Sequence, residues 1–172
     1  MGEHQMIAEK QIYFGSKEHK ELINQVMEQI AFSTINASCD LAVEKGVYPN
    51  FEGSKWSKGI FPQDHVNELN WALTDTKESI INWFQLKEKV KKNGIRNGYL
   101  MAIAPTSSIS ILVGTTQAIE PVYKRKWYEE NLSGLIPVVA PNLNLETYQY
   151  YTPAFEVDQF EIIKTAAVRG RW

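Results

Sequence analysis

The segment that decides the fold is Tyr99-Leu-Met-Ala-Ile-Ala-Pro-Thr-Ser-Ser-Ile-Ser110, with Ile119-Glu120-Pro121 following it. Its first half, residues 99–104, is a short apolar run typical of a buried strand in a parallel sheet, where both faces of the strand are covered. Pro105 ends this run because proline has no N–H to donate to a neighbouring strand. The segment therefore predicts a buried strand that stops where a loop begins.

Small hydroxyl residues follow the predicted strand directly, namely Thr106, Ser107, Ser108 and Ser110. If a helix begins there, free backbone N–H groups and the helix dipole point at one spot, and that spot suits a phosphate. The alternative is a strand, a turn and an ordinary helix cap, because Ser and Thr are common capping residues. Neither glycine-rich phosphate-binding motif is present, so these residues alone leave both interpretations open.

Two flanking stretches extend the pattern. Lys87-Glu-Lys-Val-Lys-Lys-Asn-Gly-Ile-Arg-Asn97 precedes residues 99–108, and Ile119-Glu120-Pro121 follows them. Together these stretches resemble the large (alpha) subunit of class I ribonucleoside-diphosphate reductases. In that family a Pro-Thr-x-Ser loop binds the substrate's phosphates through backbone amides and hydroxyls, and an Ile-Glu-Pro follows at the same spacing. The resemblance implies that the substrate-binding residues are Pro105, Thr106, Ser107, Ser108 and Ser110.

The resemblance covers the chain from about Gly2 to Trp172. It implies an α/β fold that is part of the ten-stranded α/β barrel of that subunit, helix-rich, with a β-hairpin insertion near residues 122–140. Residues 1–172 would then form one incomplete catalytic-barrel domain. Because the family chain is several times longer, this chain looks like an internal piece, from a split or interrupted gene or a truncated reading frame.

The resemblance also implies a role in reducing ribonucleotides to deoxyribonucleotides, and hence in DNA replication. The expected partners are a ribonucleoside diphosphate, the remaining segments of the large subunit, a metal-containing radical-generating small subunit and a thioredoxin or glutaredoxin reductant. The family's radical-bearing cysteine, its redox cysteines and its tyrosine pair have no matching motif here; Tyr150-Tyr151 has the wrong neighbours. We therefore expect no catalytic residue, metal or cofactor in this chain, and no activity from the chain alone.

Two other classes of function stay open. An independent nucleotide- or phosphate-binding α/β module without catalysis predicts a closed sheet with no unpaired strand edge. A non-catalytic interaction protein built from the helices predicts that the loop at residues 106–110 binds nothing.

The one cysteine, Cys39, lies on the apolar face of a helix predicted over residues 17–45. A lone cysteine could be a catalytic thiol, but a free cysteine is more often a small buried apolar residue. Ser16 is the predicted N-cap of this helix and Gly46 follows its end. The predicted helix is long, so a break near Ser33-Thr34 is compatible with the pattern.

Further elements follow from local signals. The sequence predicts a helix whose apolar face covers residues 80–90, with Thr76 or Asp75 as its N-cap and Gly94 at its end. A helix followed by the strand at residues 99–104 suggests a parallel sheet. It also predicts a short helical turn over 109–113 and a final helix capped by Asp158. Lys87, Lys89, Lys91 and Lys92 are interpreted as a solvated helix face that complements the dipole. Residues 47–66 are predicted to be a loop pinned by aromatic side chains.

Composition narrows the class of protein. The chain has 172 residues, of which 44% are hydrophobic, so we expect about one packed domain rather than disorder. A net charge of −2 with scattered basic residues gives no electrostatic footprint for nucleic acid. No apolar run approaches the roughly 18 residues that a membrane span requires, and the N-terminus lacks a signal-peptide pattern. With a single cysteine, no internal disulfide is possible, which favours a reducing cytoplasm.

Overall fold

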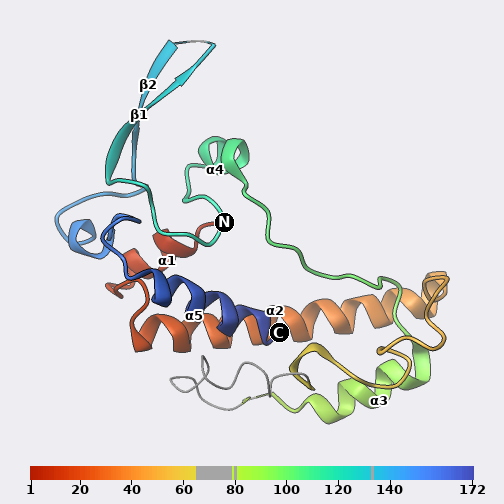
Figure 1. The fold of residues 1–172 in the computed structure, drawn as a ribbon. Helices are drawn as coiled ribbons and strands as arrows, with labels where there is room; N and C mark the ends of the chain where they lie inside the picture. Colours follow the sequence, from red (N-terminus) through yellow and green to blue (C-terminus); the bar gives the residue numbers. More distant parts are fainter. Residues whose placement is uncertain (65–78, 80, 133) are drawn as a thin grey trace. The chain divides into compact units, whose positions relative to one another are not determined.

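The computed structural model describes residues 1–64, 79, 81–132 and 134–172. The elements are helices α1 (Glu3–Glu9), α2 (Lys17–Lys45), α3 (Trp83–Asn93), α4 (Ser107–Val113) and α5 (Gln159–Gly170), the 3-10 helix η2 (Tyr148–Tyr150), and strands β1 (Lys126–Asn131) and β2 (Gly134–Val139) (Figure 1). The chain forms two compact units. Unit 1 comprises residues 1–19 and 103–164, and unit 2 comprises residues 20–102 and 165–172.

Helix α2 follows its local signals at both ends. The Ser16 hydroxyl oxygen accepts a hydrogen bond from the His19 backbone N–H at 3.1 Å, as expected of an N-cap. Gly46 has φ +78° and donates its N–H to the Ala42 carbonyl at 2.9 Å, so it ends the helix in the left-handed conformation. The possible break near residues 33–34 does not occur: α2 is continuous, and the Thr34 hydroxyl donates to the Ile30 carbonyl at 2.8 Å within it.

The core of unit 2 is rich in aromatic and branched side chains. Trp172 stacks on Trp83 with ring centroids 5.7 Å apart and donates its indole N–H to Asn24 Oδ1 at 3.0 Å. Phe51 and Phe61 of the 47–66 loop are buried in the same cluster, which confirms that aromatic side chains pin this loop. Cys39 is also in this core and is fully buried.

Helix α3 begins later than the sequence predicted. Asn82 is its N-cap and accepts the Phe84 N–H at 3.1 Å, while Gly94 ends the helix with φ +72°. The caps predicted at Thr76 or Asp75 lie outside the described residues. The predicted lysine face reaches solvent, with Lys91 and Lys92 exposed. Ion pairs that the sequence did not indicate join Lys87 to Asp64, Lys89 to Asp40 and Lys91 to Glu88.

The predicted β-hairpin is confirmed. Strands β1 and β2 pair antiparallel, from Lys126 opposite Val139 to Asn131 opposite Gly134. Near the base of the hairpin, Tyr151 is fully buried and donates its hydroxyl to the Pro141 carbonyl at 2.6 Å. Asp158 caps α5 by accepting the Phe160 N–H at 2.9 Å, also as predicted.

The buried strand predicted at residues 99–104 is wrong for the described chain. These residues are not in a strand, and Tyr99 is 97% exposed and Ile103 60% exposed. A strand requires a hydrogen-bonded neighbour, and in the described part of the chain only β1 and β2 pair. An apolar run is buried only where other elements cover it. The parallel sheet that we expected after α3 is likewise not found among the described residues.

Candidate functional site

The loop that precedes α4 is shaped by Thr106. This residue occupies the N-cap position with φ +54° and ψ +24°, a left-handed conformation that costs a non-glycine residue on the order of 1–3 kcal/mol. Its side chain does not cap the helix. Instead, the Thr106 hydroxyl oxygen accepts the backbone N–H of Ala118 at 2.9 Å. The loop is therefore tied to the residue that precedes Ile119-Glu120-Pro121.

The serines after Thr106 divide into two groups. Ser107 and Ser108 are exposed in the first turn of α4 and, with Ile109, carry backbone N–H groups that no side chain caps. Ser110 is fully buried and donates its hydroxyl to the Ser107 carbonyl at 2.9 Å. The loop thus has an outer surface of N–H and hydroxyl groups, and Ser110 supports it from inside.

Helix α1 holds the segment that follows α4. Gly2 donates its N–H to the Thr116 carbonyl at 2.8 Å, and the Thr115 hydroxyl donates to Gln5 Oε1 at 2.6 Å. These contacts join residues more than 100 positions apart in the sequence. No short-range pattern could have indicated them.

His4 is a buried residue that links Val122 to Tyr150 by hydrogen bonds, and nothing in the sequence indicated this role. Its Nδ1 accepts the Val122 N–H at 2.8 Å, so the proton resides on Nε2, which donates to the Tyr150 carbonyl at 3.1 Å. Burial lowers the pKa of His4 to about 4, and the imidazole is neutral near pH 7. His4 therefore fixes the chain directly after Pro121 through two neutral hydrogen bonds.

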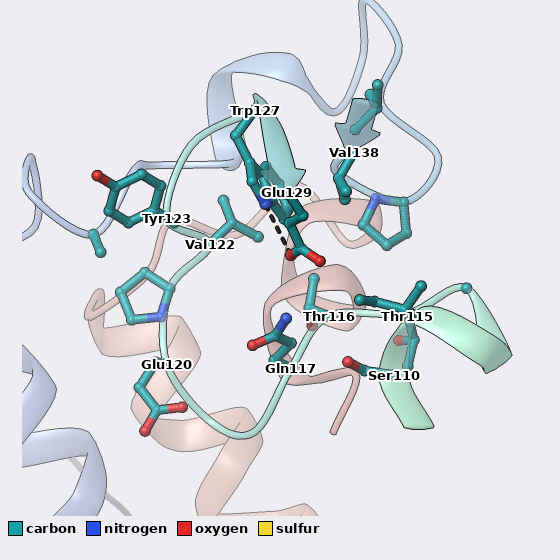
Figure 2. Close-up of a pocket in the computed structure, with 16 residues that line it drawn as sticks. Ser110, Thr115, Thr116, Gln117, Glu120, Val122, Tyr123, Trp127, Glu129 and Val138 are labelled. Atoms are coloured by element: carbon teal, nitrogen blue, oxygen red, sulfur yellow. Dashed lines mark hydrogen bonds between the residues drawn. The ribbon is translucent and has the colours of Figure 1, made fainter. Parts of the chain in front are cut away.

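A cavity of about 570 Å³ lies in unit 1 between the C-terminal end of α4, the 114–123 segment and the base of the hairpin (Figure 2). Trp127 and Glu129 line it from β1, and the indole N–H of Trp127 donates to Glu129 Oε1 at 3.0 Å. Thr116 and Gln117 line it from the segment after α4. Trp127 and Glu129 were not identified from the sequence, where they appear only as part of a hairpin strand.

Glu120 also borders this cavity. It is exposed, and its carboxylate accepts the neighbouring Ile119 N–H at 3.2 Å. Among the described residues, this local contact gives the carboxylate no positioned partner for proton transfer.

Comparison with known families tests the resemblance that the sequence motifs suggest. The sequence model of the ribonucleotide reductase barrel domain matches residues 1–172. The chain belongs to the ribonucleotide reductase barrel-domain family. The resemblance seen in the sequence motifs is thereby confirmed.

Three relatives of this barrel-domain chain carry the same name. It is 63% identical over 176 residues to the ribonucleoside-diphosphate reductase subunit alpha of Helicobacter pylori, a match that covers 100% of this chain and 22% of the relative. The corresponding subunit of Treponema pallidum is 37% identical over 172 residues, covering 99% of this chain and 19% of the relative. The corresponding subunit of Mycoplasma pneumoniae is 32% identical over 183 residues, a match that covers 97% of this chain and 25% of the relative. The barrel-domain chain thus spans about a fifth to a quarter of the length of these relatives and corresponds to a segment of the alpha subunit.

Two further features bear on what the barrel-domain segment can hold. In the described ranges, no group of three or more His, Cys, Asp or Glu side chains is placed to bind a metal ion. A search of the same residues finds no helix with the length and apolar character needed to cross a bilayer.

Proposed function

We propose that this chain supplies the substrate-phosphate-binding loop of a ribonucleoside-diphosphate reductase large subunit, which reduces ribonucleotides to deoxyribonucleotides. The observation that carries the proposal is the left-handed turn at Thr106. This turn leads into a first helical turn whose N–H groups have no side-chain cap, next to two exposed serine hydroxyls. Backbone N–H groups at a helix start bind anions well, because their partial positive charges converge.

Each residue of the predicted set has a distinct part in this proposal. Ser107 and Ser108 offer N–H and hydroxyl donors to the phosphate oxygens. Thr106 holds the strained turn through its hydrogen bond with Ala118, and Ser110 supports the turn from inside. Pro105 restricts the backbone that enters the loop.

The chemistry of reduction is assigned to other parts of the enzyme. Family members use a radical cysteine and two further thiols, whereas this chain has one cysteine, which is fully buried. We propose that the remaining large-subunit segments provide the thiols. A metal-containing small subunit would provide the radical, and thioredoxin or glutaredoxin would provide the electrons. Since the described residues offer no metal-ligand cluster, no step involving that metal is placed on this chain.

The alternative of an independent phosphate-binding module is less well supported. It requires a closed sheet, and the pairing strands among the described residues are those of one two-stranded hairpin. The exposed apolar residues Tyr99 and Ile103 favour a segment that other parts of a barrel cover.

The experiment measures the affinity for a ribonucleoside diphosphate after assembly of the chain with the remaining large-subunit segments. Ser107→Pro and Ser108→Pro each delete one N–H in the first helical turn, and Ser107→Pro also disfavours the left-handed backbone of Thr106. We expect each to weaken binding by about tenfold or more, since hydrogen bonds to charged groups contribute about 1.5–3 kcal/mol. Ser107→Ala and Ser108→Ala keep the backbone N–H and should weaken the binding less.

Ala104→Pro is the matched control, because it deletes an N–H from the exposed chain just before the loop. It should leave the affinity unchanged. Thermal unfolding of every variant checks that the assembly is folded. Unchanged affinity in both serine-to-proline variants would place the phosphate site elsewhere.

A further inference from the structure

A second hollow of about 570 Å³ lies in unit 1, and we call it the basic hollow. Three consecutive cationic residues, Lys124, Arg125 and Lys126, line it together with aromatic rings from Tyr123, Tyr148 and Phe155. It differs in character from the cavity of Figure 2, which Trp127 and Glu129 line. The proposed phosphate loop contributes no residue to it.

The cations of the basic hollow have no carboxylate partners in the described part of the chain. By contrast, Lys87, Lys89, Lys91 and Lys164 each form an ion pair. Glu156 also lines the hollow but forms no ion pair with the three cations among the described residues. The hollow therefore carries uncompensated positive charge.

Aromatic rings orient two of these cations. The Arg125 guanidinium lies 4.5 Å from the centroid of the Tyr148 ring, and its Nε donates to the Tyr148 carbonyl at 2.9 Å. The Lys124 ammonium lies 5.5 Å from the centroid of the Tyr123 ring. Because one hydrogen bond and one ring hold Arg125, its terminal nitrogens are pre-organised to donate to an anion.

Exposed aromatic rings lie beside this charge. Tyr123 and Phe155 meet edge to face with centroids 5.4 Å apart, and Phe155 is 78% exposed. Leu143 and Pro153 complete the apolar lining. A planar ligand group can stack on such rings, and base–aromatic stacking contributes about 1–3 kcal/mol per base.

We propose that the basic hollow binds a mononucleotide. Its phosphates lie against Lys124, Arg125 and Lys126, and its base stacks on the exposed ring of Phe155, with the Tyr123 ring at its edge. The combination of a charge cluster with planar rings favours this class, because inorganic phosphate uses only the cations and a nucleoside uses only the rings. The size of the hollow is also in the usual range for small-molecule sites, roughly 300–1,000 Å³.

The test measures binding of ADP, adenosine and inorganic tripolyphosphate to the 172-residue chain by calorimetry at two salt concentrations. Ser108→Pro is present throughout, so that binding at the proposed phosphate loop is weakened in every sample. We expect ADP to bind more tightly than adenosine or tripolyphosphate. The double variant Lys124→Gln/Lys126→Gln should weaken ADP binding at least tenfold and reduce the salt dependence of that binding. Phe155→Ala should weaken the binding of ADP but not the binding of tripolyphosphate.

Lys55→Gln/Lys58→Gln is the matched control, since both lysines are exposed and lie in unit 2. It removes the same charge and should leave ADP binding intact. The proposal is overturned if ADP does not bind, or if the lysine variants in the hollow and the control variants weaken ADP binding equally. It is also overturned if tripolyphosphate or an acidic peptide such as oligoglutamate binds as tightly as ADP, since the hollow would then be a general polyanion site. Equal thermal midpoints for all variants verify folding.

Discussion

The Thr106 hydroxyl oxygen lies 2.9 Å from the Ala118 backbone nitrogen and accepts its hydrogen bond. Both residues have positive φ values, +54° for Thr106 and +34° for Ala118. One hydrogen bond therefore joins two backbone positions that are unfavourable for residues with a side chain. This contact also gives a structural reason for the spacing between the Pro-Thr loop and the Ile-Glu-Pro sequence.

We expect Thr106→Val to destabilise unit 1 by about 1–3 kcal/mol, because the buried Ala118 N–H loses its acceptor. Thr106→Ser retains the oxygen and should cost clearly less. Urea unfolding of both variants compares the free energies of unfolding. Equal stability of the valine and serine variants would show that the hydrogen bond contributes nothing.

The buried His4 predicts a pH dependence of stability. Its pKa is about 4 in the folded chain, against an ordinary value of 6.5, so between these values the unfolded state binds more protons. The free energy of unfolding should therefore fall as the pH decreases from 6.5 to 4, by about 3 kcal/mol from this group.

His4→Asn keeps an acceptor for the Val122 N–H and has no titrating ring. Its unfolding free energy should change less over this pH range than that of the wild type, whatever its stability at pH 7. Parallel pH profiles for the two proteins would contradict the assignment of a neutral His4.

Gly94 and Gly46 provide a matched pair, since both have φ above +70° and both end a helix of unit 2. A Cβ on Gly94 would overlap Val47 Cγ1 and lie 3.4 Å from the Phe51 ring, whereas one on Gly46 would have no neighbour within 4 Å. Gly46→Ala should therefore lower the free energy of unfolding by about 1 kcal/mol, because alanine disfavours the left-handed backbone.

Gly94→Ala should lower the free energy of unfolding by about 1–3 kcal/mol more than Gly46→Ala, since the half-exposed Val47 side chain must also move. Chemical denaturation of both variants measures the difference. A Gly94→Ala variant as stable as Gly46→Ala would show that Val47 moves aside without penalty.

Cys39 should be inert. It is fully buried, its thiol lies 3.6 Å from the Lys89 carbonyl, and burial raises its pKa, so little thiolate forms. A thiol reagent such as dithionitrobenzoate should modify it at the rate of global unfolding, and immediately in denaturant. Cys39→Ala should leave ribonucleotide reduction by the assembled enzyme within a few-fold of wild type. Fast labelling of the native chain, or lost activity with the fold intact, would argue for a functional thiol.

The 172-residue chain alone should not reduce ribonucleotides, because one buried cysteine cannot serve as radical carrier and as two reducing thiols. The assay follows deoxynucleotide formation in the presence of small subunit and reductant, with Cys39→Ala as the matched sample. Cysteine-dependent turnover above background, from material free of host reductase, would require a different mechanism.

The sequence by itself determined the features that depend on neighbours a few residues away. Ser16 and Gly46 fix the ends of α2 because a cap acts within one helical turn, and Asp158 does the same for α5. The hairpin followed from a turn between two short strands. The family could be predicted as well, because the ordered motifs between residues 87 and 121 are specific to it.

Only the tertiary structure decided what depends on partners far along the chain. The serines after Thr106 look equivalent in sequence, yet Ser110 is buried while Ser107 and Ser108 are exposed. His4 became a buried connector through Val122 and Tyr150, more than 110 residues away. The apolar run at residues 99–104 predicted burial, but burial and strand pairing require covering elements that the run itself does not specify.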